Sequence, residues 1–201
     1  MREIFPGILQ WSWFSQEKGC DFNGHLLILG NQRVLIDPPP FSAADLETVE
    51  KHKPISYILL TNRDHVREAE GCRQHFKCRV LAPELDAPLM GITVDGTFRD
   101  GDILPGGLRA IHIPNNKSPG ETAFFLNRQK GILIVGDAVV GKPPGQLSLM
   151  PADRYKDIRQ AKNGLKVLLR YRFDAILPGD GAPILAGAGD ILNLFLKESH
   201  A

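Results

Sequence analysis

The stretch Ser56-Tyr57-Ile58-Leu59-Leu60-Thr61-Asn62-Arg63-Asp64-His65 is an apolar run that ends abruptly in polar residues. Short apolar runs bounded by polar or turn-forming residues are typical of buried β-strands. In open α/β sheets, ligands bind in the crevice beyond the carboxyl ends of such strands. We therefore expect a functional site at Asp64 and His65.

The segments around this strand predict antiparallel strands followed by strand and helix in alternation. Two apolar runs joined by Gly30-Asn31-Gln32 predict a hairpin, and Ser42 is a plausible cap for the helix that follows it. The alternation of strand and helix after residue 43 indicates crossover units. The expected strands are residues 8–14, 25–29, 33–36, 56–60, 79–82, 108–113, 122–126, 131–135 and 174–177, and the expected helices are residues 44–50, 67–76, 152–171 and 184–197.

Composition describes an ordinary globular protein, and 201 residues suit one domain spanning residues 1–201. The formal net charge of +1 gives no electrostatic reason to expect nucleic acid as a partner. No run approaches the length of a membrane span, and the first residues lack the pattern of a secretory signal. Three cysteines at no metal-ligand spacing suit reduced thiols. We expect a cytoplasmic protein with a small-molecule substrate or ligand and no membrane or nucleic-acid partner.

Four expected strands end in small polar groups, and the ends of such strands can meet along one sheet edge. Each group belongs to a short phrase: residues 61–65 (TNRDH), 113–120 (IPNNKSPG), 134–137 (IVGD) and 176–181 (ILPGDG). In this order the phrases resemble the motifs of the metallo-β-lactamase superfamily of metal-dependent hydrolases. The resemblance covers roughly residues 24–185. It implies an α+β fold, a four-layered αβ/βα sandwich of two mixed β-sheets flanked by helices.

Most motif histidines are replaced in this sequence. Where the superfamily has T-H-x-H-x-D-H, the chain has residues 61–65, and the alignment is ambiguous by two residues. The histidine of P-G-H-S-P-G falls on Asn116, with Lys117 as an insertion, and the bridging aspartate falls on Asp137. Asp180 replaces the last histidine. The resemblance then implies Asp64 and His65 as catalytic residues, and as metal ligands His65, Asp137, Asp180, Asn62 and Asn116.

This ligand set is a poor one for zinc, which prefers nitrogen and sulfur donors and normally takes at least three protein ligands. Carboxylate and amide oxygens suit magnesium or manganese better. The cofactor expectation is at most one divalent ion, zinc by resemblance or magnesium or manganese by ligand chemistry, or no ion. Carboxylates placed together also repel one another unless a cation or Arg63 neutralises them. We expect Arg63 to pair with Asp64 or Asp180, with the anchoring of an acidic substrate group as the alternative.

Two functional hypotheses follow. In the first, the chain is a metal-dependent hydrolase with an altered site, in which Asp137, Asp180 and His65 hold one ion that activates water. In the second, it is a non-catalytic protein that keeps the crevice to bind a ligand or partner. Structural roles are expected for the remaining candidates: Asp37 as a turn acceptor, and Trp11 and Trp13 in packing.

Overall fold

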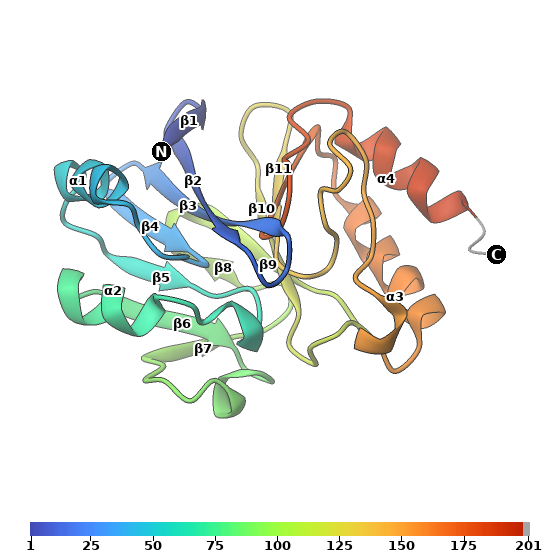
Figure 1. Ribbon diagram of the computed structural model, residues 1–201, viewed down its shortest axis with the longest axis horizontal. Coiled ribbons are helices and arrows are strands. Elements are labelled where there is room, and N and C mark those ends of the chain that lie inside the picture. Colours follow the sequence, from blue (N-terminus) through green and yellow to red (C-terminus); the bar gives the residue numbers. More distant parts are fainter. Residues whose placement is uncertain (199–201) are drawn as a thin grey trace.

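The computed structural model describes residues 1–198 and consists of two β-sheets packed face to face (Figure 1). In the first sheet seven strands lie in chain order, antiparallel from β1 to β4 and parallel from β4 to β7. These strands are β1 (Arg2–Phe5), β2 (Ile8–Ser15), β3 (Cys20–Leu29), β4 (Gln32–Ile36), β5 (Tyr57–Leu59), β6 (Arg79–Pro83) and β7 (Gly96–Phe98).

The second sheet has five strands in the order β12-β11-β10-β9-β8. All neighbours in it are antiparallel except β11 and β12, which run parallel. Its strands are β8 (Ile103–Leu104), β9 (Leu108–His112), β10 (Thr122–Leu126), β11 (Ile132–Val135) and β12 (Ala175–Pro178). Both sheets are therefore mixed.

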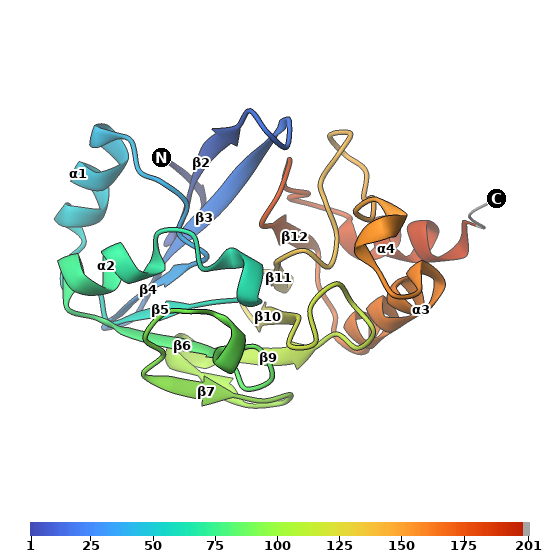
Figure 2. The ribbon, with the colours of Figure 1, turned by 60° about the horizontal axis from the view of Figure 1, so that its bottom comes forward.

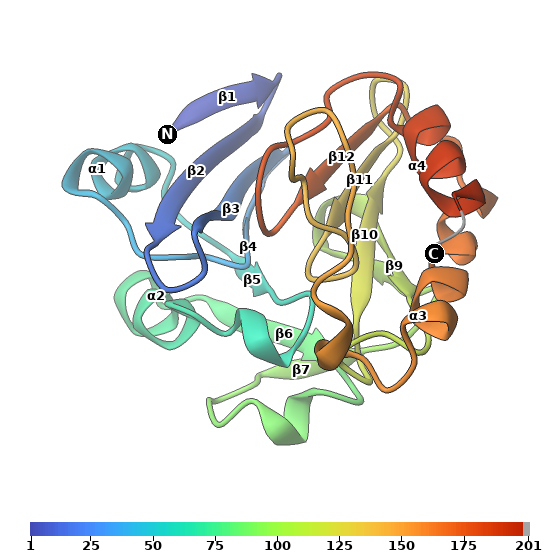
Figure 3. The same cartoon turned by 45° about the vertical axis from the view of Figure 1, so that its right-hand side comes forward.

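Helices cover the outer face of each sheet. Figure 2 shows α1 (Ala43–Lys51) and α2 (Ala69–Phe76) beside the first sheet, and Figure 3 shows α3 (Ile158–Gly164) and α4 (Ala188–Lys197) beside the second. The expected cap is present, because the Ser42 side chain accepts a hydrogen bond from the N–H of Asp45. Within residues 1–198, no helix combines the length and apolar character needed to cross a bilayer.

Alternation along the strands produces three layers of buried apolar side chains. Successive strand residues point to opposite faces, so Leu26 packs toward α1 and α2 while Leu27 packs toward the second sheet. In the second sheet, Phe124 faces the first sheet and Leu133 faces α4. One layer lies between the sheets and one lies between each sheet and its helices. The predicted four-layered α+β sandwich is confirmed.

Two expected helices are shorter than the sequence pattern indicates. The segment 152–171 divides into 3-10 turns at Ala152–Arg154 and Leu165–Arg170 with α3 between them. The segment 184–197 begins its helix only at Ala188, since Ile184 forms a β-bridge with Ile176. In both segments a tertiary contact or a turn outweighs the helical spacing of apolar residues.

The expected helix 67–76 also starts late. Arg67 has a φ of 40°, which lies in the left-handed region that bulky residues rarely adopt, so the chain turns there and α2 begins at Ala69. This turn directs the Arg67 side chain toward the strand ends, where it contacts Asp180.

Candidate functional site

The carboxyl ends of strands from both sheets meet at one edge of the sandwich, and polar residues follow them. Asp37 follows β4, Thr61 and His65 lie beyond β5, Asp137 lies just after β11, and Asp180 lies just after β12. β4 and β5 are parallel neighbours in one sheet, and β11 and β12 are parallel neighbours in the other. The site is therefore assembled from two halves of the chain.

A cavity of about 870 Å³ lies at this edge, within the size range of small-molecule sites. The buried side chains of His65, Asp137 and Asp180 line its inner part. Toward solvent it is lined by residues of the β2–β3 hairpin and of the loop before α3, which include the basic residues Lys18, Lys142 and Arg154.

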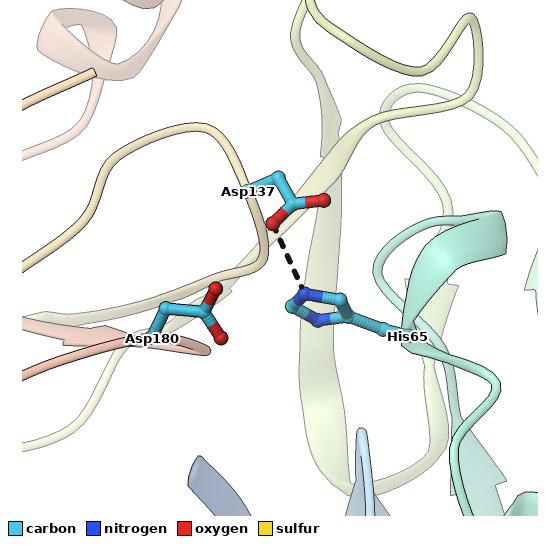
Figure 4. Close-up of side chains that lie close together, drawn as sticks. All are labelled: His65, Asp137 and Asp180. Atoms are coloured by element: carbon cyan, nitrogen blue, oxygen red, sulfur yellow. Dashed lines mark hydrogen bonds and ion pairs between the residues drawn. The ribbon is translucent and has the colours of Figure 1, made fainter. Parts of the chain in front are cut away.

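His65 lies buried between two aspartates. Its Nδ1 is 2.8 Å from Oδ2 of Asp37, and its Nε2 is 3.3 Å from Oδ1 of Asp137. Figure 4 shows the contact with Asp137 and the nearby carboxylate of Asp180. Asp37 also accepts hydrogen bonds from the N–H and the hydroxyl of Thr61, at 2.9 and 2.6 Å. The Asp37 carboxylate thus fixes the orientation of the imidazole ring.

The two aspartates also set the protonation state of His65. Burial and the charge of Arg67 lower the pKa of His65, but the charges of Asp137 and Asp37 outweigh them and raise that pKa to about 10. Burial raises the pKa of Asp137, whereas His65 and Lys117 together hold it well below its usual range. His65 and Asp137 therefore form a buried ion pair at neutral pH.

Glu121 adds a second buried carboxyl group close to Asp137. Its Oε1 accepts a hydrogen bond from the N–H of Ala138 at 3.1 Å, and its Oε2 has no hydrogen-bond partner within residues 1–198. Burial and the charge of Asp137 raise the pKa of Glu121 well above its usual value. Burial beside Asp137 thus disfavours the ionised form of Glu121.

Two basic side chains reach the acidic groups of the cavity. Lys117 Nζ lies 2.5 Å from Oδ2 of Asp137 and 3.0 Å from Oδ2 of Asp64. Arg67 Nη2 donates a hydrogen bond to Oδ1 of Asp180 at 2.8 Å. Each of these three aspartates therefore has a cationic partner supplied by the chain itself.

The structure brings together three of the five predicted metal ligands. Donor atoms of His65, Asp137 and Asp180 all lie within 4.8 Å of one another. Asp64, predicted to be catalytic with His65, has a side chain that is 43% exposed at the cavity and is bound by Lys117.

The two predicted amide ligands use their oxygens for local structure. Asn62 Oδ1 accepts a hydrogen bond from the N–H of Asp64 at 2.8 Å and so caps the 3-10 turn Arg63–His65. Asn116 Oδ1 accepts one from the N–H of Lys117 at 2.8 Å, and its Nδ2 is buried without a partner within residues 1–198. Both oxygens therefore accept hydrogen bonds that stabilise the local chain conformation.

Sequence reasoning missed four residues of this network. The missing members are Asp37, Arg67, Lys117 and Glu121. Asp37 was expected to accept hydrogen bonds within its own turn. Its carboxylate instead binds Thr61 and His65, which are distant in the sequence. The pairing expected for Arg63 is also wrong, because Asp180 pairs with Arg67 and the N–H of Arg63 donates to Asp86.

The motifs did carry a signal for the two basic residues. Without a gap, T-H-x-H-x-D-H runs from Thr61 to Arg67 and places its last histidine on Arg67. Counting back from Ser118-Pro119-Gly120 places the histidine of P-G-H-S-P-G on Lys117 rather than on Asn116. Both side chains reach the site, which supports these alignments over the gapped ones.

The donor set does not fit a resident metal ion. Asp137 Oδ2 and Asp180 Oδ1 are each bound to a basic side chain, and Nε2 of His65 lies 3.2 Å from Nη2 of Arg67. A divalent ion about 4 Å from such a cation is repelled by about 8 kcal/mol at an effective dielectric constant of about 20. The set also offers only one nitrogen donor, which is a weak basis for a zinc site.

A Gly136→Ala substitution is expected to lower the free energy of unfolding by about 1–3 kcal/mol, because it overpacks the interior below the cavity. A Cβ at this position would lie 2.3 Å from Oγ1 of Thr61, 2.6 Å from Nδ2 of Asn62 and 2.9 Å from Oε1 of Glu121. Urea unfolding followed by circular dichroism measures the change.

Gly71→Ala is the matched control. A Cβ there would lie 3.6 Å from Oε2 of Glu68, which is an ordinary contact, and alanine is favoured over glycine within a helix such as α2. The control should be neutral or more stable than the wild type. Equal destabilisation by both substitutions would contradict the close packing described around Gly136.

Comparison with known proteins agrees with the architecture of two packed sheets. The chain resembles the DIM-1 metallo-β-lactamase (16% identity, TM-score 0.74, 96% of each chain covered). Similar values relate it to metallo-β-lactamases from Pontibacter korlensis (17%, 0.74, 96% of this chain and 97% of that one) and Hirschia baltica (17%, 0.74, 100% and 98%). At such identities these similarities establish the fold.

A search of curated proteins found no match to the sequence. The sequence profile of the family described as "Metallo-beta-lactamase superfamily" matches residues 2–197, which is nearly the whole chain. Together with the sheet order and the arrangement of strand ends, this match identifies the chain as a member of the metallo-β-lactamase superfamily.

Proposed function

We propose that this chain binds a small organic anion in the cavity at the strand ends, and that it does so without hydrolysing it by a metal-dependent reaction. The observation that carries the proposal is the excess of basic side chains at the cavity. Six lysine and arginine residues line it against four aspartates. A cleft lined by an excess of one charge attracts ligands of the opposite charge.

The arrangement of these charges strengthens the proposal. Asp64, Asp137 and Asp180 are all paired with Lys117 or Arg67. The side chains of Arg63 and Arg154, which also line the cavity, form no salt bridge within residues 1–198. These two guanidinium groups are available to a carboxylate or phosphate group, which a guanidinium binds in bidentate fashion.

Superfamily membership supports a hydrolase-like function at the level of the family, but this chain's own groups are poorly suited to activate water. A general base must be unprotonated at working pH and within reach of the proton it accepts. Since the pKa of His65 is raised to about 10, both ring nitrogens carry protons at neutral pH and face Asp37 and Asp137. Asp64 is engaged by Lys117. These features favour binding over hydrolysis.

The double substitution Arg63→Ser and Arg154→Ser is expected to weaken anion binding roughly 10- to 100-fold, which corresponds to losing one or two charge-assisted hydrogen bonds. Isothermal titration calorimetry with inorganic phosphate, succinate and citrate as separate probes measures this loss. Arg128→Ser is the matched control, because Arg128 lies in the exposed turn after β10 and outside the cavity lining.

Two outcomes would contradict the proposal. One is equal binding by the double variant and the control. The other is absence of binding for all three probes. If ester, thioester or phosphodiester hydrolysis that depends on added zinc, manganese or magnesium accompanies the second outcome, the hydrolase hypothesis is restored.

A further inference from the structure

We infer that Lys117 and Arg67 supply, as permanent parts of the chain, the positive charge that metal ions supply in metal-dependent members of the superfamily, so that the site is complete without a metal. This inference goes beyond ligand binding and does not depend on which anion the cavity takes. It rests on how the two side chains are held and on which motif positions they occupy.

Lys117 lies in a position that bridges two acidic groups. Its Nζ is 2.5 Å from Asp137 and 3.0 Å from Asp64, and the Asp137 side chain is only 2% exposed. A buried carboxylate needs a compensating charge or hydrogen bonds, because burial in a low-dielectric interior disfavours the ionised form. The Lys117 ammonium group meets this need at the point where the two carboxylates approach each other.

Arg67 is held even more firmly. The same guanidinium that binds Asp180 also donates to the carbonyl oxygens of Asn23 at 3.0 Å and Asp37 at 3.3 Å. It stacks over the ring of Phe22 at 4.6 Å from the ring centroid. The Arg67 side chain is 7% exposed and its backbone has a φ of 40°. A position with so many partners and a sparsely populated backbone conformation is built into the fold.

The partners of both cations also fall on motif positions. In the ungapped alignment, Asn62, Asp64 and Arg67 stand at the three histidines of T-H-x-H-x-D-H, and Lys117 stands at the histidine of P-G-H-S-P-G. Asp180 stands at the last motif histidine. The salt bridges Lys117–Asp64 and Arg67–Asp180 therefore each join two positions that carry histidine in the superfamily motifs. Paired replacement by opposite charges conserves neutrality without an ion.

A metal ion would have to compete with these salt bridges. To be coordinated by His65, Asp137 and Asp180, it must enter beside the Lys117 ammonium group and the Arg67 guanidinium group, which already bind Asp137 and Asp180. The ion and the two basic groups would then compete for the same carboxylates and repel one another at close range, which is unfavourable. We therefore expect the wild-type protein to bind metal weakly, and to bind it more strongly once one of the two basic side chains is removed.

The test compares metal content and metal response in the wild type and in Lys117→Met. Wild-type protein purified without chelators should contain far less than one zinc, manganese or magnesium ion per chain by plasma mass spectrometry. Its melting temperature should move by less than about 1 °C with EDTA or with added Zn²⁺ or Mn²⁺. Lys117→Met should gain a rise of about 5 °C or more when the ion is present at a hundredfold excess over its Kd.

Two further variants complete the design. Lys117→Arg keeps the charge and should remain as indifferent to metal as the wild type. Lys130→Met removes an exposed lysine whose only ion pair within residues 1–198 is a 3.8 Å contact with Asp174, and it should also show no response. One tightly bound ion per wild-type chain, or an equal metal response in wild type and Lys117→Met, would overturn the inference.

The result stays decisive if Lys117→Met fails to fold, because the metal content and the metal response of the wild type and of Lys117→Arg still decide it. Failure of this inference is also distinguishable from failure of the proposed function. Anion binding is read by calorimetry with the phosphate, succinate and citrate probes, whereas this inference is read by ion stoichiometry and melting temperature. A metal-free chain that binds none of the probes would leave the inference standing and remove the ligand proposal.

Discussion

Asp37→Ala is expected to lower the free energy of unfolding by about 3–5 kcal/mol, the range for removing one partner of a buried charge pair. Asp37 is 2% exposed and accepts hydrogen bonds from the N–H and hydroxyl of Thr61 as well as from Nδ1 of His65. Truncation leaves these three buried donors unsatisfied and leaves the His65 charge with one aspartate fewer. Urea unfolding at pH 7 measures the loss.

Asp100→Ala is the control for Asp37→Ala. Asp100 also accepts a backbone hydrogen bond, from the N–H of His112, but at an exposed position. Its removal should cost about 1 kcal/mol or less. Asp37→Asn should fall between the two, since the amide retains an acceptor oxygen but loses the charge. A loss from Asp37→Ala no larger than that from Asp100→Ala would show that Asp37 does not organise the buried network.

Stability is expected to fall as the pH rises from about 6.5 to about 10. The folded-state pKa of His65 is raised to about 10, above the value of 6.5 in an unfolded chain. The folded protein therefore binds this proton more tightly than the unfolded chain does. The resulting stabilisation is fully present below pH 6.5 and is lost as the pH passes through the folded-state pKa. The shift corresponds to at most on the order of 5 kcal/mol.

Asp137 gives the opposite dependence in acid. Its folded-state pKa is lowered, so the stabilisation that it contributes is present above the unfolded-state value and is lost as the pH falls. Glu121, whose pKa is raised by burial and by Asp137, loses its contribution as the pH rises above its unfolded value of 4.5 and so adds to the decline with rising pH. Stability should therefore be greatest above the pH range in which the contribution of Asp137 is lost and below the range in which that of His65 is lost.

Urea unfolding at pH 5, 6.5, 8 and 10 tests these slopes. His65→Gln should be less stable than the wild type at pH 6.5 and should show a much flatter profile up to pH 10. His112→Gln is the matched control, because Nε2 of His112 contacts the Pro119 carbonyl and lies outside the cavity. It should keep the wild-type slope. A wild-type profile without a decline above pH 6.5 would mean that His65 is neutral in the folded protein.

Much of the fold was predictable from the sequence because it depends on local patterns. The hairpin of β3 and β4 and the strand at Tyr57–Leu59 follow from apolar runs between turn residues. Helix boundaries were less accurate where a tertiary contact decided them. Ile184 satisfies the helical spacing of its segment, yet its backbone pairs with Ile176.

The site was only partly predictable, since it depends on side chains that meet across the two sheets. Asp137 and Asp180 could be predicted because each follows a short apolar run that predicts a strand and that resembles a superfamily motif. The sequence pattern places Arg67 at the start of a helix, and nothing in its immediate neighbours indicates the left-handed turn that directs it to Asp180. The motif comparison predicts Lys117 as an insertion, because lysine is not among the usual metal ligands.

Arg67 has one more consequence, for how the molecule holds together. Its guanidinium contacts Asn23 and Asp37 in the N-terminal half of the chain and Gly179 and Asp180 near the C-terminus. Arg67, which lines the cavity, thus also cross-links the two halves of the sandwich through hydrogen bonds. A ligand that binds Arg67 would stabilise the folded state as a whole. Occupancy of the cavity should therefore increase resistance to proteolysis at sites far from the cavity.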